Sequence, residues 1–309
     1  MIKTSQLPLR IEISPEIQDA LKAKFAIVAL ESTVITHGLP YPQNLEALAM
    51  LEACARENGA IPATICMLDG VIHVGLGERE LNSLAYKMEH KERLTKLASR
   101  DLAMAYAKKS SGGTTVSATM YLAWLSGISV FATGGIGGVH RGWQNSLDIS
   151  LDIKALATIP TLVVCAGCKA ILDIPSTLEA LESAGVPVYG WQTDKFPSFY
   201  SRESGVKVAR VDSLSELANA FSTQRSLPLI SSGMLVANPI DRDHEIPRTE
   251  IEPFIEQAIQ DSKGISGKEI TPFLLGRLAE ITGNRSVTAN LALLKNNVSL
   301  AAQIAGELT

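Results

Sequence analysis

The stretch that decides the fold lies in the middle of the chain, between Ser129 and Thr177, and reads SVFATGGIGGVHRGWQNSLDISLDIKALATIPTLVVCAGCKAILDIPST. An apolar run at 128–132 leads into four glycines within 134–138 and then into a polar, acid-bearing segment. A second apolar run, at 161–166, is followed by Lys169. Two buried strands that each end in polar side chains predict an active site at the carboxyl ends of a sheet.

Apolar runs and amphipathic segments alternate along the rest of the chain. Strands are predicted at 25–30, 62–68, 71–74, 94–97, 186–191 and 227–238, and helices include 15–24, 44–57, 78–90, 116–125, 250–262, 272–281 and 287–307. This alternation predicts an α/β fold. The sequence has no internal repeat, low-complexity tract or long linker, so we expect one domain spanning 1–309.

Composition excludes several classes of protein. Of the 309 residues, 46% are hydrophobic and 19% are charged, which is enough apolar material for a sizeable core. The net charge of −4 argues against nucleic acid as a main partner. No apolar run is long enough to cross a bilayer, and the N-terminus lacks the apolar core of a signal peptide, so we expect a soluble cytoplasmic protein without a membrane partner.

Carboxylates occur at two places in the sequence where a general acid or a metal ligand could lie. Glu31 follows the apolar run at 25–30, where it is either a surface residue or an acid tuned by partial burial. Asp148 and Asp152 are four residues apart and share one face if the segment is helical. Such a pair is an exposed acidic face or an oxygen-ligand site for Mg²⁺ or Mn²⁺, and the nearby glycines, His140 and Arg141 favour the site.

Three further motifs each allow more than one interpretation. The glycine cluster is not a dinucleotide fingerprint, because His140 occupies the third glycine position. Cys165 and Cys168 form a C-x-x-C pair, but its position in mid-chain favours two small core residues over a redox pair. Lys169 is either a surface lysine or a partly desolvated amine that can attack a carbonyl carbon.

The small-residue segment 110–115 is expected to be a loop. Gly, Thr and backbone N–H groups at the start of the helix 116–125 could cradle an anion such as phosphate, although a plain N-capped loop explains the pattern equally well. Lys96, in the short strand before it, is by itself more typical of an edge residue than of a ligand contact.

Taken together, these segments resemble the pseudouridine-5′-phosphate glycosidase family, which includes the indigoidine synthase A-like proteins. The motifs that carry the resemblance are ALESTVITHGLPYPQN (29–44), LTKLASRDL (94–102), GGTTVSATM (112–120), FATGGIGGVHRG (131–142), DISLD (148–152), VVCAGCKAILDI (163–174), VANPI (236–240) and GKEITPFLL (267–275). They extend over nearly the whole chain in one order, which makes the resemblance specific.

The resemblance implies a fold, an assembly and a reaction. The fold is a three-layer α/β/α sandwich around a mixed, mainly parallel sheet, assembled into a homotrimer that uses Mn²⁺. The reaction is the reversible cleavage of the C-glycosidic bond of pseudouridine 5′-phosphate to uracil and ribose 5-phosphate, through a lysine Schiff base with the opened ribose. Such an enzyme serves nucleotide catabolism.

The resemblance also assigns roles to residues of this chain. Lys169 becomes the nucleophile, Glu31 the proton donor and Asp152 a further catalytic residue, and Asp148 becomes the metal ligand. The substrate contacts are Lys96, Val116, His140, Ser150, Leu151, Asp152 and Asn290. One departure is Cys168, where a residue such as alanine is expected.

Three other functions remain open at this point. They are a related enzyme acting on another phosphosugar, a thiol redox protein, and a phosphosugar-binding protein without catalysis.

Overall fold

The computed structural model of the protein describes residues 9–39, 41–265 and 270–309. The first eight residues and the beginning of the GKEITPFLL motif lie outside these ranges. The described chain forms an 11-stranded sheet with the order β1-β4-β3-β2-β7-β8-β11-β9-β10, from which β6 and then β5 branch at β3. The pairs β3–β4 and β3–β6 are antiparallel, and the remaining pairs are parallel.

The strands are short and largely buried. In chain order they are β1 (Ile11–Ile13), β2 (Ile27–Leu30), β3 (Ile61–Leu68), β4 (Val71–Val74), β5 (Thr95–Leu97), β6 (Gly112–Thr114), β7 (Val130–Ala132), β8 (Leu162–Cys165), β9 (Val188–Trp191), β10 (Ala209–Val211) and β11 (Met234–Ala237). All side chains of β2, β7, β8 and β11 are buried, as expected for central parallel strands covered on both faces.

Helices connect these strands. They are α1 (Pro15–Ala23), α2 (Gln43–Glu57), α3 (Glu78–Glu89), α4 (Leu102–Ala107), α5 (Val116–Leu125), α6 (Trp143–Ser146), α7 (Leu151–Thr158), α8 (Ile174–Ser183), α9 (Leu214–Ser226), α10 (Arg248–Asp261), α11 (Ile270–Ile281) and α12 (Arg285–Glu307), with a π-helical turn η2 (Val34–Gly38) and 3₁₀ turns η3 (Ser99–Asp101) and η4 (Arg242–His244).

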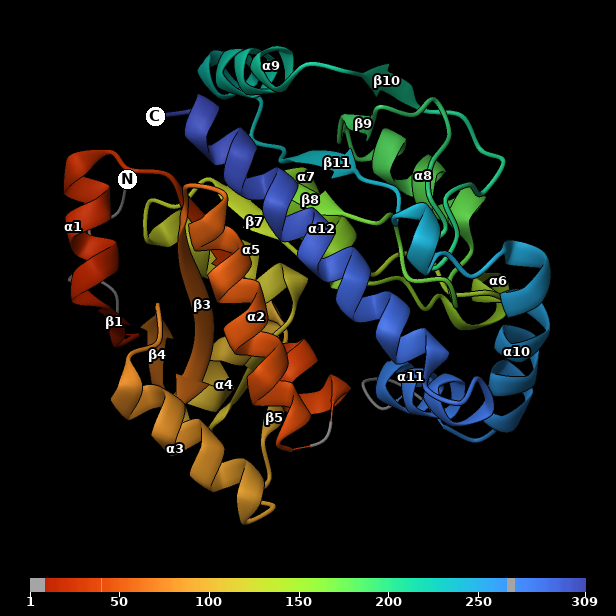
Figure 1. Ribbon diagram of the computed structural model, residues 1–309, viewed down its shortest axis with the longest axis horizontal. Helices are drawn as coiled ribbons and strands as arrows, with labels where there is room; N and C mark the ends of the chain where they lie inside the picture. The colour runs from red at the N-terminus through yellow and green to blue at the C-terminus, as the bar shows by residue number, and fades with distance from the viewer. Residues whose placement is uncertain (1–8, 40, 266–269) are drawn as a thin grey trace.

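The helices form two layers around the sheet (Figure 1). The long helix α12 crosses β7 and β8 on one face, where it also packs against α2 and α9. On the opposite face α5 packs against α7, and α7 packs against α8. This arrangement confirms the predicted three-layer α/β/α fold with a mixed, mainly parallel sheet.

Several local predictions were wrong, and each error has a physical cause. Phe25 was assigned to a buried strand, but its side chain is 53% exposed and β2 begins two residues later. The predicted loop at 110–115 contains β6, which pairs with β3 and β5. A Cβ at Gly112 would lie 2.0 Å from the carbonyl oxygen of Thr95 in β5, so this close pairing requires glycine. The predicted strand 227–238 is a strand only at β11, and Leu229 before it is fully exposed.

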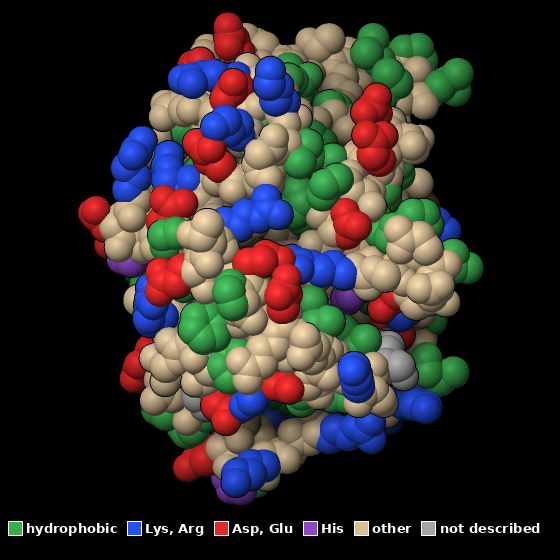
Figure 2. All heavy atoms as spheres, turned by 90° about the vertical axis from the view of Figure 1, so that its right-hand side faces the viewer, with side chains coloured by type: hydrophobic (Ala, Val, Ile, Leu, Met, Phe, Trp, Pro, Cys, Tyr) green, Lys and Arg blue, Asp and Glu red, His purple; other side chains and the backbone are tan. Residues whose placement is uncertain are grey.

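The surface carries both signs of charge. Figure 2 shows acidic and basic side chains interspersed over the face that includes α10, and neither sign dominates it. Among the described residues, no helix combines the length and the apolar character needed to span a membrane.

Candidate active site

The main pocket opens at the carboxyl ends of the parallel strands β2, β7 and β8. Glu31 directly follows β2, Thr133 directly follows β7, and Lys169 lies just beyond β8. The pocket encloses about 260 Å³. The topology therefore brings together polar side chains that are far apart in the sequence, at the edge of the sheet where ligands of open α/β folds bind.

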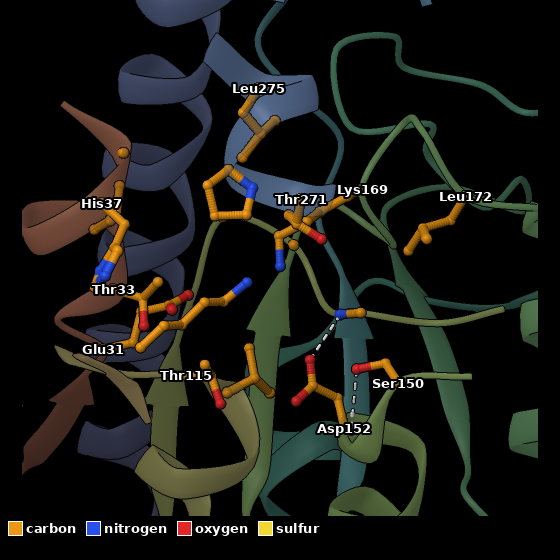
Figure 3. Close-up of a pocket in the computed structure, with 18 of the residues that line it drawn as sticks. Glu31, Thr33, His37, Thr115, Ser150, Asp152, Lys169, Leu172, Thr271 and Leu275 are labelled. Carbon is orange, nitrogen blue, oxygen red and sulfur yellow. Dashed lines mark hydrogen bonds between the residues drawn. The ribbon is translucent and has the colours of Figure 1, made fainter. Parts of the chain in front are cut away.

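All the residues that the family resemblance assigns to the site line this pocket. They are Glu31, Lys96, Val116, His140, Asp148, Ser150, Leu151, Asp152, Lys169 and Asn290. Figure 3 shows Glu31, Thr33 and His37 on one side, Ser150 and Asp152 below, and Lys169 and Thr271 towards the middle. The geometry supports a shared site, while the chemical roles of these residues remain predictions.

Lys169 extends from the β8–α8 connection into the pocket (Figure 3). Its backbone N–H donates to the carbonyl of Ile136 at 3.1 Å, which ties this connection to the glycine segment after β7. Within residues 9–39, 41–265 and 270–309, the Lys169 ammonium forms no hydrogen bond or ion pair. Arg141 supports the connection from behind, since it donates to the carbonyl of Ala170 at 3.2 Å and to Glu252 at 2.5 Å.

Glu31 is one of the carboxyl groups that line the pocket. Burial raises the pKa of its carboxyl above the ordinary value, against the opposing effects of the Lys169 charge and of a hydrogen bond from Thr133. The Thr133 hydroxyl donates to Oε1 of Glu31 in a short hydrogen bond. A carboxyl held in this way can remain protonated at a higher pH than a surface glutamate, which is the property a general acid needs.

Asp152 is a buried carboxylate with both oxygens hydrogen-bonded to backbone. Its Oδ1 accepts the N–H of Ser117 at 3.0 Å, and its Oδ2 accepts the N–H of Gly137 at 2.8 Å. A Cβ at Gly137 would lie 2.2 Å from Oγ of Ser150 and 2.8 Å from Oδ2 of Asp152, so this close approach requires glycine. Asp152 therefore connects the start of α5 to the glycine segment of the pocket.

Asp148 and Asp152 would share one face only if both were helical, and this condition is not met. Helix α7 begins only at Leu151, because Ser150 is its N-cap and accepts the N–H of Asp152. Asp148 lies before the helix in an extended segment and faces His140, with Nε2 and Oδ2 3.9 Å apart. Burial lowers the pKa of His140, and the charge of Asp148 opposes that shift.

The oxygen atoms available near Asp148 determine whether a divalent cation could bind there. Asp152 is occupied by backbone donors, and the described residues contain no cluster of three or more His, Cys, Asp or Glu side chains arranged as metal ligands. Mg²⁺ and Mn²⁺ are often bound through one carboxylate together with waters and substrate oxygens. The Asp148 side chain, 37% exposed at the pocket, fits such a hydrated ion but not an all-protein cage.

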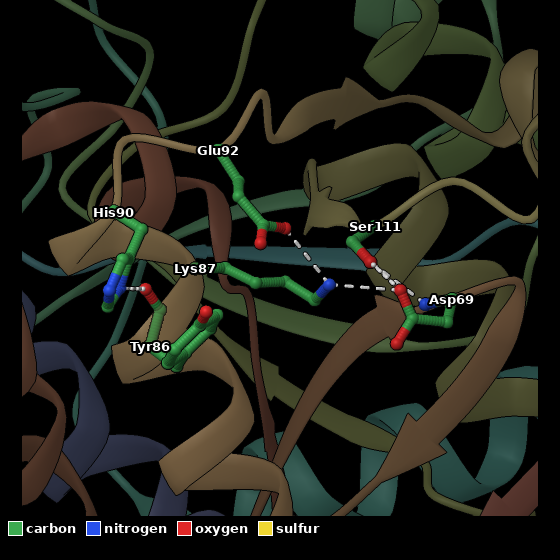
Figure 4. A network of polar contacts seen from close by, with 6 residues as sticks. All are labelled: Asp69, Tyr86, Lys87, His90, Glu92 and Ser111. Atoms are coloured by element: carbon green, nitrogen blue, oxygen red, sulfur yellow. Dashed lines mark hydrogen bonds and ion pairs between the residues drawn. The ribbon is translucent and has the colours of Figure 1, made fainter.

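Lys96 reaches the pocket from the antiparallel branch of the sheet. Its strand β5 pairs with β6, and the Thr95 N–H donates to the carbonyl of Ser111 at 2.9 Å. Figure 4 shows the polar network beyond this branch, in which Lys87 donates to Asp69 at 3.0 Å and to Glu92 at 3.1 Å. The Ser111 hydroxyl joins the network by donating to Asp69 at 3.0 Å.

The N-terminus of α5 also faces the pocket, through Thr115 and Val116. Val116 lines the pocket but is almost fully buried, with its side chain in the core. The N–H of Ser117 is already taken by Asp152. This helix terminus, proposed from the sequence as an anion cradle, is thus partly used to stabilise a carboxylate of the protein itself.

The cysteines are core residues, as the sequence analysis favoured. Cys165 and Cys168 are fully buried and not joined by a disulfide, and burial raises the pKa of each thiol to about 12. A reactive redox cysteine needs an accessible thiolate, so this geometry argues against the thiol redox alternative.

Some residues of the pocket or next to it were missed by sequence reasoning. One of them is Thr133, whose position directly after β7 matches that of Glu31 after β2. The helix α11 contributes Thr271 and Leu275 to the upper wall (Figure 3), and Pro272 also lines the pocket. No sequence pattern indicated that this helix folds back over the sheet edge.

Comparisons with known proteins agree on one family. The sequence profile described as "Indigoidine synthase A like protein" matches residues 16–307. The chain is 50% identical over 305 residues to the pseudouridine-5′-phosphate glycosidase of Paracoccus denitrificans, covering 98% of this chain and 99% of that protein. It is 49% identical over 301 residues to the protein of the same name from Caldanaerobacter subterraneus, covering 96% of each.

Two solved structures share the fold of this chain over nearly its whole length. An indigoidine synthase A-like protein from Thermotoga maritima superposes with a TM-score of 0.88 at 36% identity, over 97% of both chains. The prealnumycin C-glycosynthase AlnA, solved in complex with ribulose 5-phosphate, gives a TM-score of 0.88 at 35% identity, over 98% of both chains.

Proposed function

The chain belongs to the indigoidine synthase A like protein family, and we propose that it is a pseudouridine-5′-phosphate glycosidase. In this proposal it cleaves the C–C glycosidic bond of pseudouridine 5′-phosphate to uracil and ribose 5-phosphate, and the reaction is reversible. The observation that carries the proposal is the placement of the Lys169 amine and the raised-pKa Glu31 carboxyl in one pocket at the sheet edge.

A C-glycoside needs different chemistry from an ordinary glycoside because its leaving group is a carbon. The usual pair of carboxylates protonates a leaving oxygen and supplies a nucleophile or base, and it has no means of stabilising charge on a departing carbon. An amine nucleophile solves this, since its lone pair can form a C=N bond as the C–C bond breaks. Lys169 is the amine placed to do so.

The first step opens the ribose. The Lys169 nitrogen bonds to C1′, the bond from C1′ to the ring oxygen breaks, and the protonated Glu31 carboxyl gives its proton to that oxygen. The nitrogen then returns a proton to the Glu31 carboxylate. Desolvation, the largest influence on Glu31, favours the protonated acid at the start of this cycle.

The second step breaks the C–C bond. The nitrogen lone pair forms the C1′=N iminium, the bond from C1′ to C5 of uracil breaks, and C5 takes a proton from Glu31. Water adds to the iminium, which releases ribose 5-phosphate as its aldehyde and restores the lysine. The atoms balance as one substrate and one water giving uracil and ribose 5-phosphate.

The other pocket residues would position the substrate. Lys96 supplies positive charge suited to the phosphate, and the backbone of Val116 and the segment Ser150–Asp152 would contact the sugar phosphate. His140 and Asn290 complete the proposed substrate contacts.

The cofactor, assembly and location belong to the same proposal. We assign a single Mn²⁺ in each subunit to Asp148, where the ion would add positive charge near the acidic segment and hold water molecules in order. We also propose a homotrimer in the cytoplasm. Light scattering with size-exclusion chromatography tests the trimer, and titration of Mn²⁺ into wild type and Asp148→Asn tests the metal.

A second candidate is favoured by the structural likeness to AlnA, whose name describes a C-glycosynthase. The same lysine chemistry run in reverse would join a phosphosugar to an aromatic acceptor other than uracil. The pocket would then accept an acceptor larger than a pyrimidine.

The deciding experiment measures uracil release from pseudouridine 5′-phosphate with and without Mn²⁺. We expect uracil and ribose 5-phosphate in equal amounts. Binding of ribose 5-phosphate without turnover would favour the non-catalytic alternative, and turnover only with larger aromatic C-ribosides would favour the second candidate.

A further inference from the structure

Two buried amide side chains are hydrogen-bonded in series to Thr133, the residue that donates to Glu31. Asn297, on α12, is fully buried, and its Nδ2 donates to the carbonyl of Thr133 at 2.8 Å. Its Oδ1 accepts from Nδ2 of Asn238 at 3.1 Å, and Asn238 follows β11. The Thr133 hydroxyl then donates to Glu31, which completes a continuous path from α12 to this carboxyl.

The path joins strands that do not pair with each other. Thr133 directly follows β7 and Asn238 directly follows β11, and β8 lies between these two strands in the sheet. The backbone N–H of Thr133 donates to Val164 at 3.0 Å, and that of Asn238 donates to Cys165 at 2.8 Å, both in β8. Asn297 therefore bridges the carboxyl ends of β7 and β11 across the strand that leads to Lys169.

Burying the polar amide of Asn297 costs free energy unless its donor and acceptor atoms form hydrogen bonds. Its helix α12 packs on β7 and β8, and most of the other buried residues of this helix are apolar, such as Leu293, Val298 and Ile304. A leucine there would bury more apolar surface without the need for partners. The buried amide is explained by the Thr133 carbonyl, which has passed the end of β7 and needs a donor.

We propose that Asn297, held by Asn238, is a positioning residue that fixes Thr133 so that its hydroxyl donates to Glu31. Asn297 itself touches neither the pocket nor the substrate. The catalytic meaning of this inference rests on the proposed function, in which Glu31 is the proton donor.

The groups that face Glu31 determine the direction in which its pKa shifts when the Thr133 hydrogen bond is lost. The charges are Lys169 from the β8–α8 connection, Asp152 from α7 and Lys96 from β5, and the Thr133 hydroxyl is the neutral donor. That hydrogen bond favours the ionised carboxylate, so its loss raises the pKa of Glu31 further. Since a general acid works when protonated, the high-pH limb of the rate profile should move to higher pH.

The test compares Asn297→Leu with Thr133→Val, which removes the hydroxyl directly. Both should lower kcat by about 10- to 100-fold, because a small displacement of a reacting group is enough for such a loss, and both should leave KM nearly unchanged. Both should move the high-pH limb upward by about half to one pH unit. The double variant should show no further shift, since the two residues act along one path.

Gln224→Leu is the matched control. Gln224 is another buried amide, and it donates to the carbonyls of Ser232 at 2.8 Å and Gly233 at 3.2 Å, at the opposite end of β11. Its loss should lower Tm as Asn297→Leu does, without moving the pH profile. Asn297→Asp gives a conservative rescue, because a protonated aspartic acid can donate to Thr133 and accept from Asn238. This variant should regain activity as the pH is lowered.

A readout independent of turnover separates this inference from the proposed function. Infrared difference spectra of ¹³C-glutamate-labelled protein, taken against Glu31→Gln, follow the protonation of Glu31 directly. We expect its titration to move to higher pH in Asn297→Leu and to stay in place in Gln224→Leu. An unmoved Glu31 titration in folded Asn297→Leu would overturn the inference, whereas absence of uracil release by wild type would overturn only the proposed function.

Discussion

Two lysines in different regions of the molecule have opposite surroundings. Lys87, in the network beyond β5, has a side chain only 14% exposed and donates to two carboxylates, which raises its pKa (Figure 4). Lys169, in the pocket, forms no such bond within the described residues. A lysine engaged by carboxylates contributes to structure, and one left without them at the end of a buried strand is available as a nucleophile.

The largest effect should come from exchanging these lysines for methionine. Lys169→Met should lower uracil release by at least about 10³-fold, because the proposed covalent step is lost. Lys87→Met should keep nearly full activity, since its partners lie outside the pocket. Measured kcat values for both variants check this contrast, with Lys154→Met as a control at an exposed lysine. A fully active Lys169→Met would contradict it.

The next effect concerns Glu31, the partner of Lys169 in the pocket. Glu31→Gln should lower kcat by about 10²- to 10³-fold, and the high-pH limb of the profile should disappear with the acid. The raised pKa means that the folded protein loses stability as pH rises from 4.5 through the folded value. Glu31→Gln should therefore have a higher Tm than wild type at neutral pH, which thermal scans across pH would check.

A smaller effect is expected at Asp152. Asp152→Asn replaces one acceptor oxygen by an amide donor, so either Ser117 or Gly137 loses its partner. The loss should cost about 1–3 kcal/mol of unfolding free energy and reduce kcat/KM as well. Denaturant titration measures the first quantity. Unchanged stability would mean that the two backbone donors do not depend on the carboxylate.

The smallest expected effect is a loss of stability when the hydrogen-bond network of Lys87 is disrupted. The hydrogen bond from Lys87 lowers the pKa of Asp69, so its contribution to stability is present above 3.8 and is lost as pH falls through the lower folded value. Asp69 is 69% exposed, and Asp69→Asn should cost about 0.2–1 kcal/mol, with less effect at high salt. Urea titrations at two salt concentrations check this, and a loss of activity would contradict the separation of the two regions.

The sequence pattern predicted that side chains following buried strands meet at one edge of the sheet, while their chemical roles came from the family resemblance and remain predictions. Glu31 and Lys169 each come after an apolar run, and parallel neighbours place such residues at one sheet edge. The relation of Asp148 to Asp152 was not predictable from spacing, because the start of α7 is set by the Ser150 cap. The wall from α11 and the Asn297 bridge depend on how the C-terminal helices pack, and local patterns do not encode that packing.

The most direct test of the central claim is chemical trapping of the Schiff base. Wild type is incubated with ribose 5-phosphate and borohydride, digested, and mapped by mass spectrometry, with Lys169→Met treated in parallel. The account predicts a reduced ribose 5-phosphate adduct on the Lys169 peptide, none on the Lys87 peptide, and none in the variant. An adduct on a different lysine, or uracil release by an enzyme that cannot be trapped, would contradict it.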